Sequence, residues 1–274
     1  MAPKGRQSKQ KARLSNYDKL MSQDQKQVDE KLEIFIPNGP RLGTSIIEAN
    51  HVSKAFGNKL LYDDLNFVLP QAGIVGVIGP NGAGKSTVFK MVMGEEQADV
   101  GRFSIGSTVK LAYVDQSHSN INPEKTIWQN FSDEQELIIL GGRQVNSRAF
   151  LSRFNFSGSE QNKKVSTLSG GERNRLHLAM TLKEEGNVLL LDEPTASLDP
   201  ETGDFVRTFL EKYKKEKKVS ILLASHNMDE VTRLCSSIMM MKNGLIIDQG
   251  KPNDLVKKHG RQNLEEVFLK LVRN

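Results

Sequence analysis

The stretch Gly79-Pro80-Asn81-Gly82-Ala83-Gly84-Lys85-Ser86-Thr87 decides the fold. It fits the pattern G-x-x-x-x-G-K-[ST], an apolar run precedes it, and apolar residues at helical spacing follow it. Glycines let backbone N–H groups turn inward around phosphates, and the N-terminus of the following helix adds positive charge. Lys85 is expected to reach the β- and γ-phosphates and Ser86 to ligate Mg²⁺. The predicted phosphate-binding residues are Gly79, Asn81, Gly82, Gly84, Lys85, Ser86 and Thr87.

A second polar motif supports this interpretation. The apolar run Val188–Leu191 ends in the two carboxylates Asp192 and Glu193. Ligands of open α/β sheets bind at the carboxyl ends of the strands, so both side chains are expected near the phosphates. Asp192 is predicted to hold Mg²⁺, and Glu193 to orient or deprotonate an attacking water. Adjacent carboxylates at a strand end can also form a simple turn, but the phosphate loop favours the hydrolytic pair.

The rest of the chain indicates the fold class. Several predicted strands are apolar without alternation, which is typical of strands covered on both faces. Helical stretches lie between them, so we predict an α/β fold with a parallel-rich sheet and an antiparallel edge. The predicted strands are 65–69, 73–79, 109–114, 187–192, 219–225 and 237–247.

Composition narrows the protein class. The chain has 274 residues, 37% hydrophobic and 26% charged, as expected of a soluble globular protein. It contains neither an apolar run long enough to span a membrane nor the apolar core of a signal peptide. The single cysteine, Cys235, excludes an internal disulfide and is read as a small buried residue rather than a nucleophile. We expect a cytoplasmic protein, or alternatively one bound peripherally to the cytoplasmic face of the inner membrane.

Positive charge is concentrated at the N-terminus. The net charge is +5, and residues 1–20 carry six basic side chains against one acidic side chain, Asp18. Such a run either follows a nucleic-acid backbone or forms the solvated face of a helix. The Pro- and Gly-rich segment 36–43 then marks a boundary. The predicted parts are a basic helical linker (1–44), an ATPase domain (45–250) and a C-terminal helical extension (251–274).

Further motifs carry a family resemblance. Leu168-Ser169-Gly170-Gly171-Glu172 resembles the signature of ABC ATPases, and Ala196-Ser197-Leu198-Asp199 resembles their D-loop. The resemblance implies a RecA-like core, a helical signature subdomain at about 117–180 and the cofactors ATP and Mg²⁺. It also implies catalytic roles for Gln116 and His226, metal binding by Gln116, adenine stacking on Phe56, and nucleotide contacts from Ser169, Gly170, Gly171 and Asp199. The chain has one phosphate loop and one signature, so a family-type site requires a second ABC domain, in a homodimer or a paired subunit.

Two parts of the chain resemble two different branches of this superfamily. Residues 4–195 resemble the C-terminal half of a translational throttle factor of the ribosome-associated ABC-F family, through KGRQSKQKARL, IFIPNGPRLG, SRAFLSRFNFSG and LSGGERNRLHLA. That resemblance implies contact with ribosome or tRNA through residues 1–20. Residues 196–274 instead resemble the ATP-binding subunit of an ABC exporter, through ASHNMDEVTRLC, MMKNGLIIDQGKP and NLEEVFLKLVR. A natural fusion, a designed chimera or an assembly artefact joined at LLLDEPT each gives this mosaic.

Three functions follow from these resemblances. The first is a translation-associated ATPase, the second is the motor subunit of an exporter with a membrane permease, and the third is an ATP-dependent switch that only dimerises. In transporters the segment between Q-loop and signature docks on membrane subunits. Here that segment, residues 117–168, looks like the ABC-F text. The first function is therefore favoured.

Overall fold

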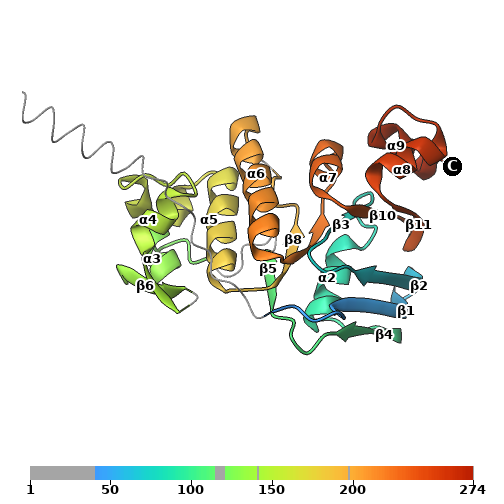
Figure 1. Ribbon diagram of the computed structural model, residues 1–274, viewed down its shortest axis with the longest axis horizontal. Coiled ribbons are helices and arrows are strands. Elements are labelled where there is room, and N and C mark those ends of the chain that lie inside the picture. Colours follow the sequence, from blue (N-terminus) through green and yellow to red (C-terminus); the bar gives the residue numbers. More distant parts are fainter. Residues whose placement is uncertain (1–40, 115–120, 141, 197, 274) are drawn as a thin grey trace, which may run out of the picture. The chain divides into compact units, whose positions relative to one another are not determined.

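The computed structural model describes residues 41–114, 121–140, 142–196 and 198–273, and a six-stranded sheet lies at its centre (Figure 1). Its strand order is β11-β10-β3-β9-β8-β5, parallel except for the antiparallel pair β10–β11. Every residue of β3, β8 and β9 is buried, which explains their unbroken apolar sequences. The strands are β3 (Ile74–Ile78), β5 (Leu111–Val114), β8 (Val188–Asp192), β9 (Ser220–Ala224), β10 (Ser237–Lys242) and β11 (Leu245–Gly250).

A smaller antiparallel sheet packs on one side of the central sheet. It has the order β2-β1-β4, with β1 (Ile47–Phe56), β2 (Lys59–Leu69) and β4 (Val100–Ile105). Helix α2 (Lys85–Met93) lies between the two sheets, and its Val88 and Phe89 are buried in one core with residues of both. This core fixes the helix that begins in the phosphate loop.

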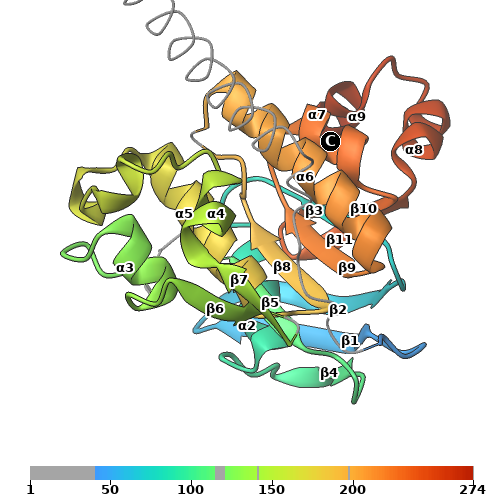
Figure 2. The same ribbon diagram turned by 60° about the vertical axis from the view of Figure 1, so that its left-hand side comes forward.

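Helices cover the opposite side of the central sheet. Figures 1 and 2 show α5 (Gly170–Lys183), α6 (Pro200–Lys217) and α7 (Met228–Leu234) along that side. The C-terminal helices α8 (Pro252–His259) and α9 (Leu264–Arg273) pack against each other. Asp248 of β11 anchors α8, because it accepts hydrogen bonds from Lys258 at 2.8 Å and contacts His259 Nε2 at 2.6 Å. The extension is thereby tied to the sheet edge.

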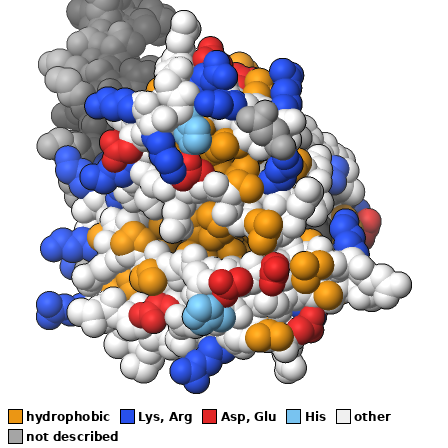
Figure 3. Space-filling model, turned by 90° about the vertical axis from the view of Figure 1, so that its right-hand side faces the viewer, with side chains coloured by type: hydrophobic (Ala, Val, Ile, Leu, Met, Phe, Trp, Pro, Cys, Tyr) orange, Lys and Arg blue, Asp and Glu red, His pale blue; other side chains and the backbone are white. Residues whose placement is uncertain are grey.

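The face formed by these C-terminal helices and the sheet edges is mixed in character. Figure 3 shows hydrophobic side chains gathered in its middle, with charged side chains around them. The exposed apolar residues that β1, β2, β11 and α9 contribute are Phe56, Leu60, Val68, Leu245 and Leu269. None of the helices in the described ranges is both long and apolar enough to cross a bilayer.

The segment before the signature forms a small subdomain with its own core. It contains α3 (Ile127–Ser132), β6 (Leu137–Leu140), β7 (Arg143–Asn146), α4 (Ser147–Ser152) and the 3₁₀ turns η1 (Glu160–Asn162) and η2 (Val165–Thr167). Phe150 stacks between two other buried rings, with centroid distances of 5.2 Å to Phe131 and 5.3 Å to Phe154. Capping hydrogen bonds from Thr126 and Asn146 start α3 and α4.

The structure departs from the predicted elements in several places. The predicted strand 237–247 is a hairpin, because Asn243 (φ 51°) and Gly244 (φ 80°) form a turn between β10 and β11. Strands β1 and β4 were not predicted, since their sequences mix polar and apolar residues. The predicted helical subdomain also contains the hairpin β6–β7. Most of the predicted linker, residues 1–40, lies outside the described residues.

Replacement of Phe150 by alanine is expected to destabilise the fold. The change opens a cavity between two buried rings, so the free energy of unfolding should fall by about 3–5 kcal/mol. Urea denaturation of the variant and the parent chain measures the difference. Phe205→Ala is the control, because Phe205 is stacked on Phe209 at 6.5 Å but is not part of the buried core. Equal losses for the two variants would contradict the account of this core.

Candidate nucleotide-binding site

The phosphate loop connects β3 to α2 in a tightly wound conformation. Gly82 and Gly84 have positive φ angles of 80° and 99°. A side chain at Gly84 would collide with the hydroxyl of the buried Tyr62, which donates a hydrogen bond to the Gly84 carbonyl. The Lys85 ammonium folds into the loop, where it donates to the carbonyls of Gly79 at 2.8 Å and Pro80 at 3.3 Å. The loop therefore places a cation beside its own backbone, as phosphate binding requires.

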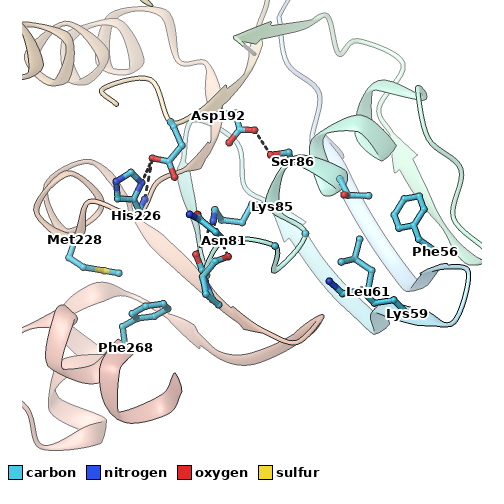
Figure 4. A pocket seen from close by; sticks show the side chains of 16 residues that line it. Phe56, Lys59, Leu61, Asn81, Lys85, Ser86, Asp192, His226, Met228 and Phe268 are labelled. Carbon is cyan, nitrogen blue, oxygen red and sulfur yellow. Dashed lines mark hydrogen bonds and ion pairs between the residues drawn. The ribbon is translucent and has the colours of Figure 1, made fainter. Parts of the chain in front are cut away.

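Two oxygen ligands meet beside this loop. The Ser86 hydroxyl, in the first turn of α2, donates to Asp192 Oδ2 at 2.6 Å (Figure 4). Asp192 is the last residue of β8 and is 4% exposed. Residues 106 positions apart in the sequence are thus in contact, as the predicted metal site requires.

Glu193 and His226 form a second contact at the same edge. His226 Nδ1 lies 2.7 Å from Glu193 Oε2, and the backbone N–H of His226 donates to the same oxygen at 3.3 Å. The Glu193 side chain is 7% exposed, whereas that of His226 is 69% exposed. One carboxylate oxygen thereby contacts both the ring nitrogen and the backbone N–H of His226, while most of the imidazole is exposed.

The backbone of Glu193 is strained. Its φ angle is +55°, in the left-handed region, which costs a non-glycine residue about 1–3 kcal/mol. Two backbone hydrogen bonds hold it there, from the Glu193 N–H to the Ala224 carbonyl at 2.9 Å and from the Ala196 N–H to the Glu193 carbonyl at 3.0 Å. The turn directs the carboxylate toward His226 and the phosphate loop.

A single cavity of about 770 Å³ joins these groups. Figure 4 shows its walls, with the phosphate loop between Phe56 on one side and His226, Met228 and Phe268 on the other. The predicted residues that line it are Phe56, Gly79, Asn81, Gly82, Gly84, Lys85, Ser86, Thr87, Asp192, Glu193 and His226. Its size and mixed lining suit a nucleotide.

Sequence analysis missed other lining residues, namely Lys59, Leu61, Pro80, Met228 and Phe268. Phe268 lines the cavity from α9. Apolar residues recur at helical spacing in this segment, but spacing alone does not specify which element an apolar helix face meets.

The buried Lys54 lies against the ring of Phe56. The ring is 49% exposed, and Lys54 Nζ lies 5.0 Å from its centroid. The same ammonium pairs with Glu96 at 2.7 Å and donates to the Gln97 carbonyl at 2.8 Å. The Glu96 hydrogen bond raises the pKa of Lys54 above its usual value.

The signature residues lie outside this cavity. Ser169 caps α5, where its hydroxyl accepts from the Glu172 N–H at 3.2 Å and its N–H donates to Glu172 at 2.7 Å. Ser169 and Gly170 are exposed and Gly171 is half-buried, and none of the three lines the cavity. Asp199 caps α6 by accepting from the Thr202 N–H at 2.9 Å. Gln116 is outside the described residues, and its predicted role stays a prediction.

The fold is that of an ABC-type ATPase domain. Residues 62–196 match the family model described as "ABC transporter". The solved structure of an ATP-binding subunit of an ABC transporter aligns with a TM-score of 0.69 at 21% identity, covering 83% of this chain and 99% of that one. A dimeric post-hydrolysis state of the ATP-binding cassette MJ0796, bound to ADP and Pi, gives 0.64 at 22% identity, covering 75% and 98%.

Within this class, curated relatives include energy-dependent translational throttle proteins. The protein EttA of Haemophilus influenzae is 51% identical over 200 residues, or 73% of this chain and 36% of the relative. EttA of Mycobacterium tuberculosis is 46% identical over 239 residues, covering 86% and 42%. The uncharacterized ABC transporter ATP-binding protein YfmR of Bacillus subtilis is 33% identical over 258 residues, covering 93% and 40%. The chain thus spans only about two fifths of these relatives.

Loss of the Phe56 ring is expected to weaken nucleotide binding. Phe56→Ala removes an aromatic surface at the cavity, and aromatic contacts contribute about 0.5–1.5 kcal/mol, so the Kd for ATP should rise roughly 2- to 13-fold. Phe56→Tyr keeps the ring and is the control. Titration with a fluorescent ATP analogue measures both. An unchanged Kd for Phe56→Ala would show that this ring does not contact the nucleotide.

Proposed function

We propose that the chain binds and hydrolyses ATP in a two-site dimer and that it serves a translation factor of the throttle type. The observation that carries the hydrolytic part is the convergence of Lys85, Ser86, Asp192, Glu193 and His226 on one cavity. Phosphoryl transfer needs positioned charge more than covalent chemistry, and these groups supply it.

The residues present fit Mg²⁺. This ion prefers oxygen ligands and is usually bound by one or two carboxylates together with substrate phosphates and water. The Ser86 hydroxyl and the Asp192 carboxylate, 2.6 Å apart, offer such a pair. Bound there, the ion would neutralise phosphate charge.

Glu193 is the proposed general base. Its carboxylate accepts the proton of a water whose oxygen attacks the γ-phosphorus, and ADP then leaves with the β–γ bridging oxygen. His226 contacts Oε2 of Glu193 at 2.7 Å, and we assign the water to Oε1. The exposed imidazole lines the same cavity, which supports a contact with the γ-phosphate.

The dimer is proposed because the chain's own signature lies outside its own cavity. The open N-terminus of α5, with Ser169, Gly170 and Gly171, is suited to an anion held by another subunit. Asp199 is placed at a neighbouring helix start. A second ABC domain, in a homodimer or a paired subunit, would complete each site.

The proposed process rests on sequence likeness to the throttle proteins. The proposed parts are a linker (1–44), the ATPase domain (45–250) and a C-terminal extension (251–274). We propose that residues 1–20 of the linker contact the ribosome or tRNA. The proposed location is the cytoplasm. The exporter-like text of residues 196–274 supports the alternative, a motor subunit bound to a membrane permease. The identity of 46–51% to throttle proteins favours translation.

Glu193→Gln is expected to stop turnover without preventing binding. Loss of a general base lowers a rate by roughly 10²- to 10⁴-fold, while Lys85, Ser86 and Asp192 still hold the nucleotide. Phosphate release measures hydrolysis, and size-exclusion chromatography with Mg·ATP measures dimerisation. Lys85→Ala is the contrasting variant, because it should lose ATP affinity itself. Parent-like turnover in Glu193→Gln would eliminate the proposed base.

Deletion of residues 1–20 should weaken salt-dependent binding to ribosomes. Six basic side chains in this stretch can neutralise phosphates, so log K should fall against log salt with a slope of roughly −0.7 to −0.9 per phosphate. The deletion should flatten this slope and leave ATP hydrolysis intact. Co-sedimentation across a salt series, with both chains carrying Glu193→Gln, tests this. Equal sedimentation of the two chains would count against the translation role, and co-purification with an integral membrane protein would then favour the exporter.

A further inference from the structure

A buried carboxylate that the proposed chemistry does not use lies behind the catalytic edge. Glu230, on α7, is 0% exposed. Its Oε2 accepts a hydrogen bond from the Ser225 hydroxyl at 2.5 Å, and its Oε1 accepts one from the Thr195 hydroxyl at 2.9 Å. Both carboxylate oxygens thus have a hydroxyl donor, and the two donors belong to different segments of the chain.

These two segments are the ones that carry the proposed catalytic groups. Thr195 follows Glu193 by two residues, and Ser225 immediately precedes His226. They leave the neighbouring parallel strands β8 and β9, where Asp192 is paired with Ala224. Glu230 therefore joins the segments that follow both strands, and it is not among the residues that line the nucleotide cavity.

Further hydrogen bonds hold this Ser225–Glu230–Thr195 bridge in place. The Asn227 side chain caps α7 by accepting from the N–H groups of Asp229 at 3.0 Å and Glu230 at 3.1 Å. Ser225 Oγ accepts from the Asn227 N–H at 3.1 Å while its own hydroxyl donates to Glu230. A shift of the Glu230 carboxylate would disturb the start of α7 and both hydroxyls together.

Loss of either hydroxyl donor to the buried Glu230 carboxyl is expected to cost free energy. Burial raises the pKa of Glu230, the hydrogen bonds from Ser225 and Thr195 oppose the rise, the charge of Glu193 adds to it, and Arg207 opposes it. A buried carboxyl group that loses a donor costs more than the hydrogen bond alone contributes. The carboxyl therefore resists separation of the two hydroxyls.

We propose that Glu230 is a positioning residue for ATP hydrolysis, which fixes Thr195 and Ser225 relative to each other and so keeps Glu193 and His226 in contact. The proposal rests on the hydrolytic role of Glu193 proposed above. Glu193 needs such support because its backbone is strained at φ +55°. A strained backbone returns to a more favourable conformation when the segment that holds it is released. Relaxation would move a carboxylate whose contact with His226 is 2.7 Å.

Hydrogen exchange of the nucleotide-free chain tests the bridge without any activity. Ser225→Ala should speed amide exchange in residues 193–196, and Thr195→Val should speed it in 225–228, each by about fivefold, the effect of one lost buried hydrogen bond. Thr181→Val is the matched control, because Thr181 is a buried threonine whose hydroxyl lies 3.4 Å from the Tyr113 carbonyl, outside the cavity. If amide exchange became faster only in the segment that carries the substitution, the proposal that Glu230 couples the two segments would be wrong.

Steady-state kinetics test the effect of the Glu230 hydrogen bonds on ATP hydrolysis. Thr195→Val should lower kcat by about 10- to 100-fold, the effect of a small misplacement, while KM for ATP and the melting temperature stay near those of Thr181→Val. In a Glu230→Ala background Thr195→Val should have no further effect on kcat. Glu230→Gln should keep kcat within about threefold of the parent, because its amide can still accept from one hydroxyl and donate to the other.

The outcomes separate this inference from the proposed function. A kcat for Thr195→Val equal to that of Thr181→Val, or an equal loss with and without Glu230, would refute the positioning role while hydrolysis stands. A large loss in Glu230→Gln would also refute it, because the role would then depend on charge and not on hydrogen-bond geometry. If the parent hydrolyses no ATP, or Glu193→Gln turns over normally, the proposed function fails and the catalytic role of Glu230 fails with it, whatever the exchange experiment shows.

Discussion

The register of three parallel strands is the constraint on which the site depends. β3, β8 and β9 are adjacent, and Ala224 at the end of β9 is paired with Val77 on one side and Asp192 on the other. Because the three strands run in the same direction and end at one level, the loops that leave them emerge together. A slip of one residue in the β8–β9 register would turn the side chains of one strand to the opposite face and separate Asp192 from Ser86.

The same register produces local strain and the means to hold it. Glu193 must turn as soon as β8 ends, and it adopts a left-handed backbone that a glutamate avoids in most settings. The Ala224 carbonyl of the neighbouring strand accepts its N–H, and Glu230 ties the following segment to the His226 segment from behind. Strain at a functional carboxylate and a buried polar bridge are thus two parts of one arrangement.

The parts of the chain before and after residue 196 pack into one continuous core. Leu190 of β8 and Leu222 of β9 are buried in the same cluster. That cluster also includes Met239 and Met241 of β10 together with Val88 of α2. Strands on both sides of residue 196 therefore share the central sheet, and the two parts do not form separate domains.

The sequence by itself determined the α/β class, the phosphate loop, the carboxylate pair and the family, because these depend on short motifs beside strongly apolar strands. Lys85, Ser86, Asp192 and Glu193 could each be predicted to lie at one site, since glycine spacing and strand ends carry local information, and all four line one cavity. Only the tertiary structure decided that Phe268 of the C-terminal helix lines the cavity and that Glu230 joins Thr195 to Ser225. It also revealed β1 and the hairpin β6–β7, whose residues follow no clear alternation. Such contacts join segments far apart in the chain, and they form only when the strands align and the helices pack, which no local pattern encodes.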